Sequence, residues 1–284
     1  MTVFLVTGVT GNLGTAALRS LLVHVRVADV RVLVRTERAA AEYAARGLTA
    51  CVADYSDSAS LDRAFAGVDR AIVVSSPVLD PSVRTAQHRR VVGAAVAAGV
   101  RHVVYTSGMG ARHDPGHSAA EDALTESSVH HAILRNALYT DPFVDRALTQ
   151  ALASGVIQSA SAGQRIATAA IGDLGDAAAT ASIIMPTKQL WELRGPAWNF
   201  EEMATALTAS LRRQISQEEV SDEETGPFAV LFPLVRRGVF ASESDGLAEL
   251  LGHAPASISD VVHSLVSQLN QDQHENEGFS ARKR

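Results

Sequence analysis

The chain has 284 residues, of which 46 % are hydrophobic and 20 % charged, and its formal net charge is -6. This composition is typical of a folded α/β protein and disfavours nucleic acid as a partner, because no excess of basic residues would bind its phosphates. No apolar run spans a membrane, no signal-peptide pattern is present and Cys51 has no second thiol, so we expect a cytoplasmic protein with a small-molecule partner and no membrane contact.

Short, continuously apolar runs alternate with segments of helical pattern in the first half of the chain. Such continuity is typical of strands buried on both faces of a parallel sheet. One helical segment, 83–98, stops at Gly99, a residue suited to the position after a helix. The alternation predicts βαβ units and a Rossmann-type, doubly wound α/β fold. The predicted strands are residues 3–6, 30–34, 48–52, 71–74, 103–105 and 132–134.

After about Met185 the pattern changes to a run of helices, one of which opens at Asn199 with Glu202 three residues later, as in a capping box. We expect residues 1–155 to form the dinucleotide-binding domain. Residues 156–270 should hold the remaining Rossmann elements and a smaller C-terminal α+β lobe for the substrate, and the polar residues 271–284 a disordered tail. The alanine-rich segment 83–98 suits either sheet packing or a contact between two copies, so a homodimer is left open.

The loop VTGVTGNLG, residues 6–14, joins the first strand to the first helix. Its three glycines have the spacing at which a tight turn, backbone approach to a pyrophosphate and close helix packing each require glycine. N–H groups at the helix N-terminus would then face the phosphate charge. An ordinary turn is the alternative, but the strand and helix on either side favour dinucleotide binding. The predicted loop contacts are Gly8, Thr10, Gly11, Asn12, Leu13 and Gly14.

Residues at the ends of the following strands indicate which dinucleotide binds. Arg35 stands near the position where NAD-specific domains carry a carboxylate, and its guanidinium suits a 2′-phosphate, which predicts NADP(H) rather than a merely solvated arginine. Asp54 and Tyr55 follow the third strand, where a carboxylate can reach the adenine amino group, although Asp54 could instead cap a helix. The residues expected to border the cofactor at the next strand ends are Ser75, Ser76, Pro77 and Thr106.

Several segments together resemble the NmrA-like atypical short-chain dehydrogenases/reductases, in particular quinone oxidoreductase-like members that use NADPH. They are TGVTGNLG, LVRT, VVSSP, VVYTSG and AILRN, followed by LWELRGPAWNFEEMA and VFASESDGLAELLG, so the likeness covers nearly the whole chain. It implies an NADP(H)-binding Rossmann fold with a small C-terminal lobe closing a cleft over the nicotinamide. The family holds both reductases and non-catalytic redox sensors, and fold likeness does not choose between them.

The resemblance implies a Tyr-x-x-x-Lys pair after the fifth strand, and this chain lacks it. The two places fall near His113 and His117, and a histidine can donate a proton at neutral pH, the alternative being surface histidines. Ser107 and Tyr139 are further catalytic candidates, Ser107 for binding a substrate carbonyl or the nicotinamide carboxamide and Tyr139 for lining the pocket. We expect no metal site, since Pro115 and Gly116 argue against one helix through the histidines. A hydrolase is disfavoured because TSGMG lacks the nucleophile elbow.

The resulting hypothesis is an NADPH-dependent reductase that transfers hydride to a quinone, an enone or a ketone. A non-catalytic NADP(H) redox sensor is the first alternative, motivated by the missing Tyr-x-x-x-Lys pair. A cofactor-dependent isomerase or dehydratase is the second.

Overall fold

The computed structural model describes residues 2–281 and divides into two compact units made of interleaved segments. The first unit comprises Met1–Ala137, Ile171–Leu193 and Asp245–His253. The second comprises Leu138–Ala170, Arg194–Ser244 and Ala254–Arg284. The domain boundary expected at residue 155 therefore falls inside the second unit, which the chain enters at Leu138 and leaves again at Ile171.

The first unit is built on a seven-stranded sheet of order β3-β2-β1-β4-β5-β6-β9, in which every pairing is parallel. The order reverses direction between β1 and β4, which confirms the doubly wound fold and places the topological switch point there. All six strands expected from the apolar runs are present. The strands are β1 (Phe4–Val6), β2 (Val30–Val34), β3 (Thr49–Val52), β4 (Arg70–Val74), β5 (His102–Gly108), β6 (His130–Asn136) and β9 (Leu190–Leu193).

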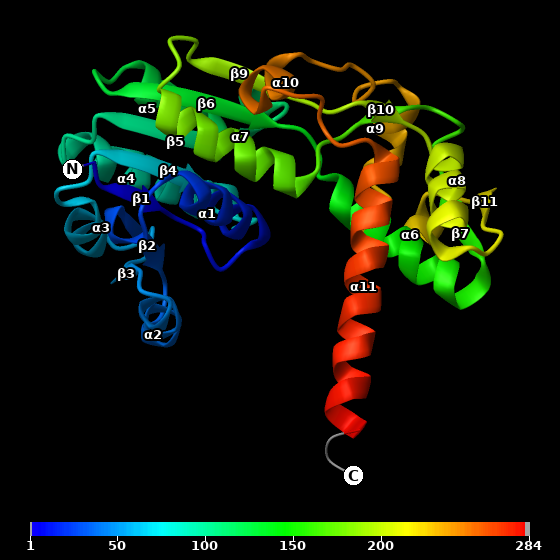
Figure 1. Cartoon of the computed structure of the whole chain (residues 1–284). Coiled ribbons are helices and arrows are strands. Elements are labelled where there is room, and N and C mark those ends of the chain that lie inside the picture. Colours follow the sequence, from blue (N-terminus) through cyan, green and yellow to red (C-terminus); the bar gives the residue numbers. More distant parts are fainter. Residues whose placement is uncertain (1, 282–284) are drawn as a thin grey trace. The chain divides into compact units, whose positions relative to one another are not determined.

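Helices cover both faces of this sheet (Figure 1). α1 and α7 pack together on one face, and α3, α4 and α5 pack in sequence on the other. α2 lies against β2 and β3, and α10 against α7 and β9. The helices of this unit are α1 (Asn12–His24), η1 (Val27–Asp29), α2 (Glu37–Ala45), α3 (Ser58–Phe65), α4 (Pro81–Ala97), η2 (Ala111–His113), α5 (Pro115–Thr125), α7 (Ile171–Ile184) and α10 (Gly246–Leu251).

The contact between α1 and α7 is close enough to require a glycine. A Cβ atom on Gly175 would lie 2.5 Å from the Cβ of Ala16 and 2.7 Å from its carbonyl carbon. Two helices approach this closely only where one of them presents no side chain, so α1 is pressed between its strand and α7.

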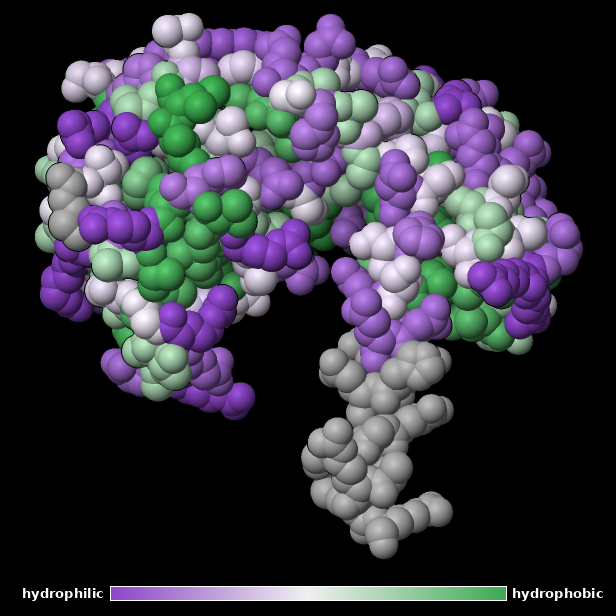
Figure 2. Space-filling model, viewed as in Figure 1, coloured by the Kyte–Doolittle hydropathy of each residue, from purple (hydrophilic) through white to green (hydrophobic). Residues whose placement is uncertain are grey.

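Hydrophobic side chains also reach the surface on this face of the first unit, over α1 and α7 (Figure 2). Val23 of α1 and Ile184 of α7 are largely exposed. The alanine-rich segment considered for a subunit contact is α4, on the other face, and a homodimer stays a prediction.

The second unit contains helices and two small sheets, β8 with β10 antiparallel and β7 with β11 parallel. Its core includes an aromatic cluster in which the Phe143 ring stacks on Phe228 at 4.5 Å and meets Trp198 edge-on at 5.8 Å. The expected capping box of Asn199 and Glu202 opens α8. The elements are α6 (Thr140–Ser154), β7 (Val156–Ser159), β8 (Ile166–Ala167), β10 (Ala197–Trp198), α8 (Phe200–Leu211), β11 (Ser216–Glu219), η3 (Glu223–Phe228), α9 (Phe232–Arg236) and α11 (Ile258–Ala281).

The C-terminal helix is longer than the sequence suggested. α11 continues to Ala281, over most of the segment expected to be a disordered tail, and the last part of that prediction, 282–284, lies outside the described residues. Neither α11 nor any other helix in residues 2–281 combines the length and apolarity needed to cross a membrane.

A buried histidine joins the sheet to the end of α7. His102, at the start of β5, is fully buried, and its Nε2 donates to the Ala181 carbonyl at 3.0 Å. Its Nδ1 lies 2.9 Å from Nδ1 of His130. Burial is the main reason that the pKa of His102 falls to about 4, and the neighbouring His130 lowers it further.

This low pKa makes stability depend on pH. In the unfolded chain His102 binds a proton below about pH 6.5, whereas in the folded protein it does so only near pH 4, so acid favours unfolding across that interval. We expect His102 to remove about 3 kcal/mol of the free energy of unfolding as pH falls from about 6.5 to about 4. Urea unfolding at stepped pH should show a shallower dependence in His102→Gln; equal slopes in the two proteins would contradict this assignment.

Candidate functional site

The glycine loop is shaped by two positions that exclude a side chain. Gly8 has φ +66°, and a Cβ there would lie 2.8 Å from the Cβ of Val74 on β4. A Cβ on Gly14 would lie 2.1 Å from the Gly8 carbonyl oxygen. Gly8 therefore makes the turn and Gly14 lets α1 pack on the loop, the two structural roles expected of these glycines.

Gly11 differs from these two glycines because its Cβ position is open. The nearest atom, the Gly8 oxygen, would be 3.5 Å away, an ordinary contact. Gly11 precedes α1 in extended conformation, and no side chain caps this end of the helix. Free N–H groups and open space at a helix N-terminus fit a pyrophosphate, as predicted for this loop.

Side-chain hydroxyl groups hold the loop and the strand ends beside it in place. The Val9 carbonyl accepts from Tyr43 Oη of α2 at 2.5 Å and from Thr15 Oγ1 at 2.8 Å. Tyr55 Oη donates to Thr7 Oγ1 at 2.5 Å, and Thr7 Oγ1 accepts from the Val74 backbone N–H at 2.9 Å. The Tyr55 hydroxyl thus ties the ends of β1 and β4 together, a structural role that its expected place at the adenine did not include.

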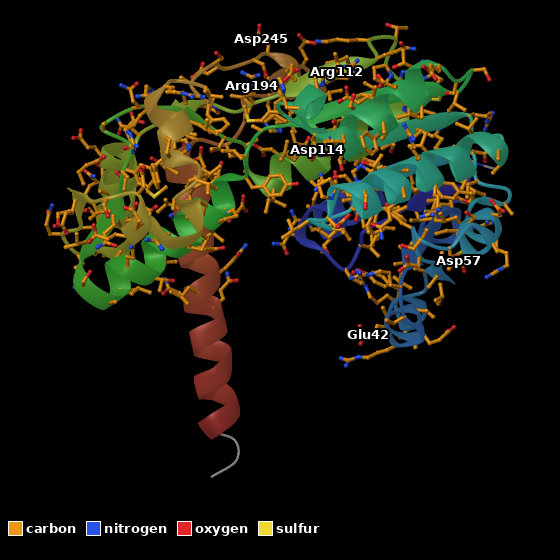
Figure 3. All side chains as sticks on the ribbon, turned by 180° about the vertical axis from the view of Figure 1, so that it is seen from behind. Glu42, Asp57, Arg112, Asp114, Arg194 and Asp245 are labelled. Carbon is orange, nitrogen blue, oxygen red and sulfur yellow. The ribbon has the colours of Figure 1, made fainter. Side chains whose placement is uncertain are left out.

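The predicted cofactor residues on the adenine side stand at the carboxyl ends of β2 and β3. Arg35 follows β2 directly and is exposed, and its guanidinium forms no hydrogen bond or ion pair within residues 2–281. Asp54 follows β3, where its Oδ1 accepts from the Ser56 N–H. The helix cap is Asp57 instead, at the start of α3 (Figure 3).

On the other side of the switch point, small polar residues end β4 and β5. The Ser75 N–H donates to Thr106 Oγ1 at 3.2 Å, which links the two strand ends. Ser76 is buried and donates to Gln87 Oε1, whereas Pro77 is exposed. Thr106 therefore holds the β4 loop in place.

His117 lies in a buried hydrogen-bonded network rather than at the surface. The Tyr105 hydroxyl, fully buried on β5, lies 2.9 Å from Nδ1 of His117 and 3.0 Å from Nδ1 of His88. Arg84 Nη2 donates to His117 Nε2 at 2.8 Å, and the Ser76 N–H donates to His88 Nε2 at 2.9 Å. The network joins the two helices α4 and α5 to the interior strand β5.

The two fixed donors decide where the imidazole protons lie. Because Nε2 of His117 and of His88 each accept a hydrogen bond, each neutral ring carries its proton on Nδ1 and directs it to Tyr105. Burial, together with the nearby Arg84 guanidinium, lowers the pKa of His117 to about 4. His117 is therefore neutral at pH 7 and has no proton on Nε2.

Tyr105, His88 and Arg84 were not among the residues predicted from the sequence. Their one signal is the spacing of four between Arg84 and His88, which places both side chains on one face of α4. In the sequence, Tyr105 resembles an ordinary core residue, because it lies in the apolar run that forms β5.

Ser107 is held by a buried ion pair. Its Oγ donates to Glu121 Oε1 at 2.7 Å, and Arg135 binds the same carboxylate through Nε at 3.0 Å and Nη2 at 2.7 Å. Burial alone would raise the pKa of Glu121, but the hydrogen bonds from Arg135 and Ser107 outweigh it and lower the pKa. The carboxylate is ionised and fully engaged, so it has no proton to donate.

Two catalytic candidates remain, His113 and Tyr139. His113 is exposed in η2, and Asp114 between it and α5 caps that helix by accepting from the His117 N–H at 3.0 Å (Figure 3). Tyr139 belongs to the second unit, at the start of α6. No group of three or more potential metal ligands occurs in the described part of the chain.

Known proteins resemble this chain over nearly its whole length. The sequence profile of the NmrA-like family matches residues 2–124. Quinone oxidoreductase 2 of Escherichia coli (strain K12) is 31 % identical over 288 residues, covering 93 % of this chain and 99 % of that protein. The structure of the Citrobacter sp. triphenylmethane reductase complexed with NADP(H) has a TM-score of 0.84 at 28 % identity, covering 93 % of this chain and 99 % of that chain. The Escherichia coli NADPH-dependent quinone oxidoreductase complexed with NADPH has a TM-score of 0.79 at 29 % identity, covering 94 % and 99 %.

The different surroundings of Gly14 and Gly11 give a matched pair of substitutions. Gly14→Ala should lower the free energy of unfolding by about 1–3 kcal/mol, because its methyl group meets a backbone carbonyl that cannot turn away. Gly11→Ala should leave stability within about 0.5 kcal/mol of the wild type, because the space is open. Urea unfolding of both variants tests this; equal losses would show that the loop is not packed as described.

Proposed function

This chain belongs to the NmrA-like family, and on that premise we propose that it is an NADPH-dependent reductase whose hydride acceptor is a quinone or a related electron-poor carbonyl compound. The reductase activity and the cofactor follow from its likeness to the quinone oxidoreductase and the triphenylmethane reductase. The acceptor class is our own inference from the chemistry of the site.

The observation that carries the cofactor assignment is the open space at Gly11 before an uncapped helix. The backbone N–H groups there would hold the pyrophosphate, and Arg35 would pair with the 2′-phosphate. NADPH, when bound, supplies the hydride. Ser75 and Thr106 at the ends of β4 and β5 would border its nicotinamide half.

The acceptor class follows from what the site lacks. His117 accepts from Arg84 and is neutral, and the Glu121 carboxylate is ionised and bound by Arg135 and Ser107. At neutral pH the imidazolium form of His117 and the protonated form of Glu121 are therefore not available as acids. A simple ketone becomes a strongly basic alkoxide and would need such a donor, whereas a reduced quinone is a stabilised oxyanion that water can protonate. We therefore assign His117 to holding Tyr105 and Arg84 in place, and the proton to water.

The cofactor assignment is tested by calorimetric titration with NADPH, NADP+, NADH and NAD+. We expect NADPH to bind more tightly than NADH, and Arg35→Ala to weaken NADPH binding about tenfold or more while leaving NADH unchanged, because only NADPH carries the 2′-phosphate. Arg63→Ala, an exposed arginine of α3, serves as the control. No binding of any of the four nucleotides would overturn the proposed function.

The proton source is tested by the pH dependence of hydride transfer to a quinone, followed as the loss of NADPH absorbance in single turnovers. We expect a constant rate between pH 6 and 8, because on our assignment water delivers the proton, and neither His117 nor Glu121 is a protonated acid in this range. If His117 were the acid, the rate would fall about tenfold for each pH unit above its pKa. Such a fall, abolished in His117→Gln, would contradict our assignment.

A further inference from the structure

One buried side-chain amide, at the carboxyl end of β6, has no hydrogen-bond partner among the described residues. Asn136 ends β6 and is only 5 % exposed. Its Oδ1 is buried without a hydrogen-bond partner, and the side chain forms no hydrogen bond with any residue in the described part of the chain. Buried polar groups are almost always satisfied, so an amide left unpaired at a strand end indicates a ligand.

The position of Asn136 selects the part of the cofactor that it can meet. Gly8 and Arg35 follow β1 and β2, so the phosphates and the adenine half belong on that side of the switch point. β6 lies beyond β4 and β5 on the other side, and Asn136 pairs in register with Gly108. The nicotinamide half of the dinucleotide therefore extends toward Asn136.

The Asn136 side chain is directed away from the ion pair on the neighbouring residue. Arg135 turns toward Glu121 of α5, and side chains alternate along a strand, so Asn136 faces the side of α7. It takes no part in the network around Glu121.

Resting on the proposed function, we propose that the Asn136 amide binds the carboxamide of the nicotinamide. A primary carboxamide presents one acceptor and one donor edge, and so does asparagine, so the two can pair through two hydrogen bonds. Asn136 Oδ1 accepts from the carboxamide NH2, and Asn136 Nδ2 donates to its oxygen. This pairing fixes the rotation of the nicotinamide ring and thereby which of its two faces is turned to the substrate.

The test compares NADP+ with its 3-acetylpyridine analogue, in which a methyl group replaces the carboxamide NH2. Calorimetry gives the ratio of the two dissociation constants for the full-length wild type, Asn136→Leu and the control Asn270→Leu, an exposed asparagine of α11. We expect the wild type and the control to prefer NADP+ by about fivefold or more. In Asn136→Leu the ratio should approach one.

A stability measurement separates binding from folding. Leucine has nearly the shape of asparagine and leaves no polar atom unpaired, so Asn136→Leu should have a Tm equal to or above that of the wild type. An unchanged NADP+ preference in this variant, or a changed KM for the quinone with unchanged cofactor affinities, would overturn the inference. Absence of NADP+ binding to the wild type would instead overturn the proposed function itself.

Discussion

The first unit depends on one short contact, between the Gly8 carbonyl and the first turn of α1. With no side chain at Gly14, α1 starts directly above the end of β1, and Gly175 lets α7 press on it from outside. The helix is held between strand and helix, so its N-terminus has little freedom to move. In the proposed cofactor site, backbone atoms would therefore set the phosphate position, and the Arg35 side chain would decide only which dinucleotide is preferred.

On the other side of the switch point, at β5 and β6, buried charged side chains neutralise one another. Glu121 and Arg135 cancel each other inside the protein, and Ser107 is committed to the same carboxylate. Burial, together with the neighbouring Arg84, lowers the pKa of His117 and keeps it neutral. Of the two positions implied by the resemblance, the one near His117 lies among groups that bind one another, whereas the one near His113 is exposed. This arrangement is the basis of our proposal that the acceptor receives hydride without assistance from an acid.

The sequence predicted those parts of the fold that depend on local sequence patterns. All six apolar runs are strands, the glycine spacing matches a turn, an open position and a close contact, and the capping box begins α8. It placed the remaining Rossmann elements within residues 156–270, but it did not identify β9 and α10 as the segments that return to the first unit, because such long-range contacts leave no local pattern in the sequence. Tyr105 and Asn136 were missed for a related reason. In the sequence, Tyr105 resembles an ordinary core residue and Asn136 an ordinary strand end. What distinguishes them is that Tyr105 has histidine partners in the folded protein and the Asn136 amide has none among the described residues.

The return of β9 has a consequence for how the protein is made. Strand β6 has been synthesised once the chain reaches Asn136, but its neighbour β9 begins only at Leu190. While the residues between them are synthesised, one side of β6 therefore has no strand to pair with. Closing that long loop is slow compared with the local βαβ steps before it. Translation speed and chaperone access over residues 137–190 should therefore influence yield, and a fragment ending near residue 155 would keep this edge uncovered.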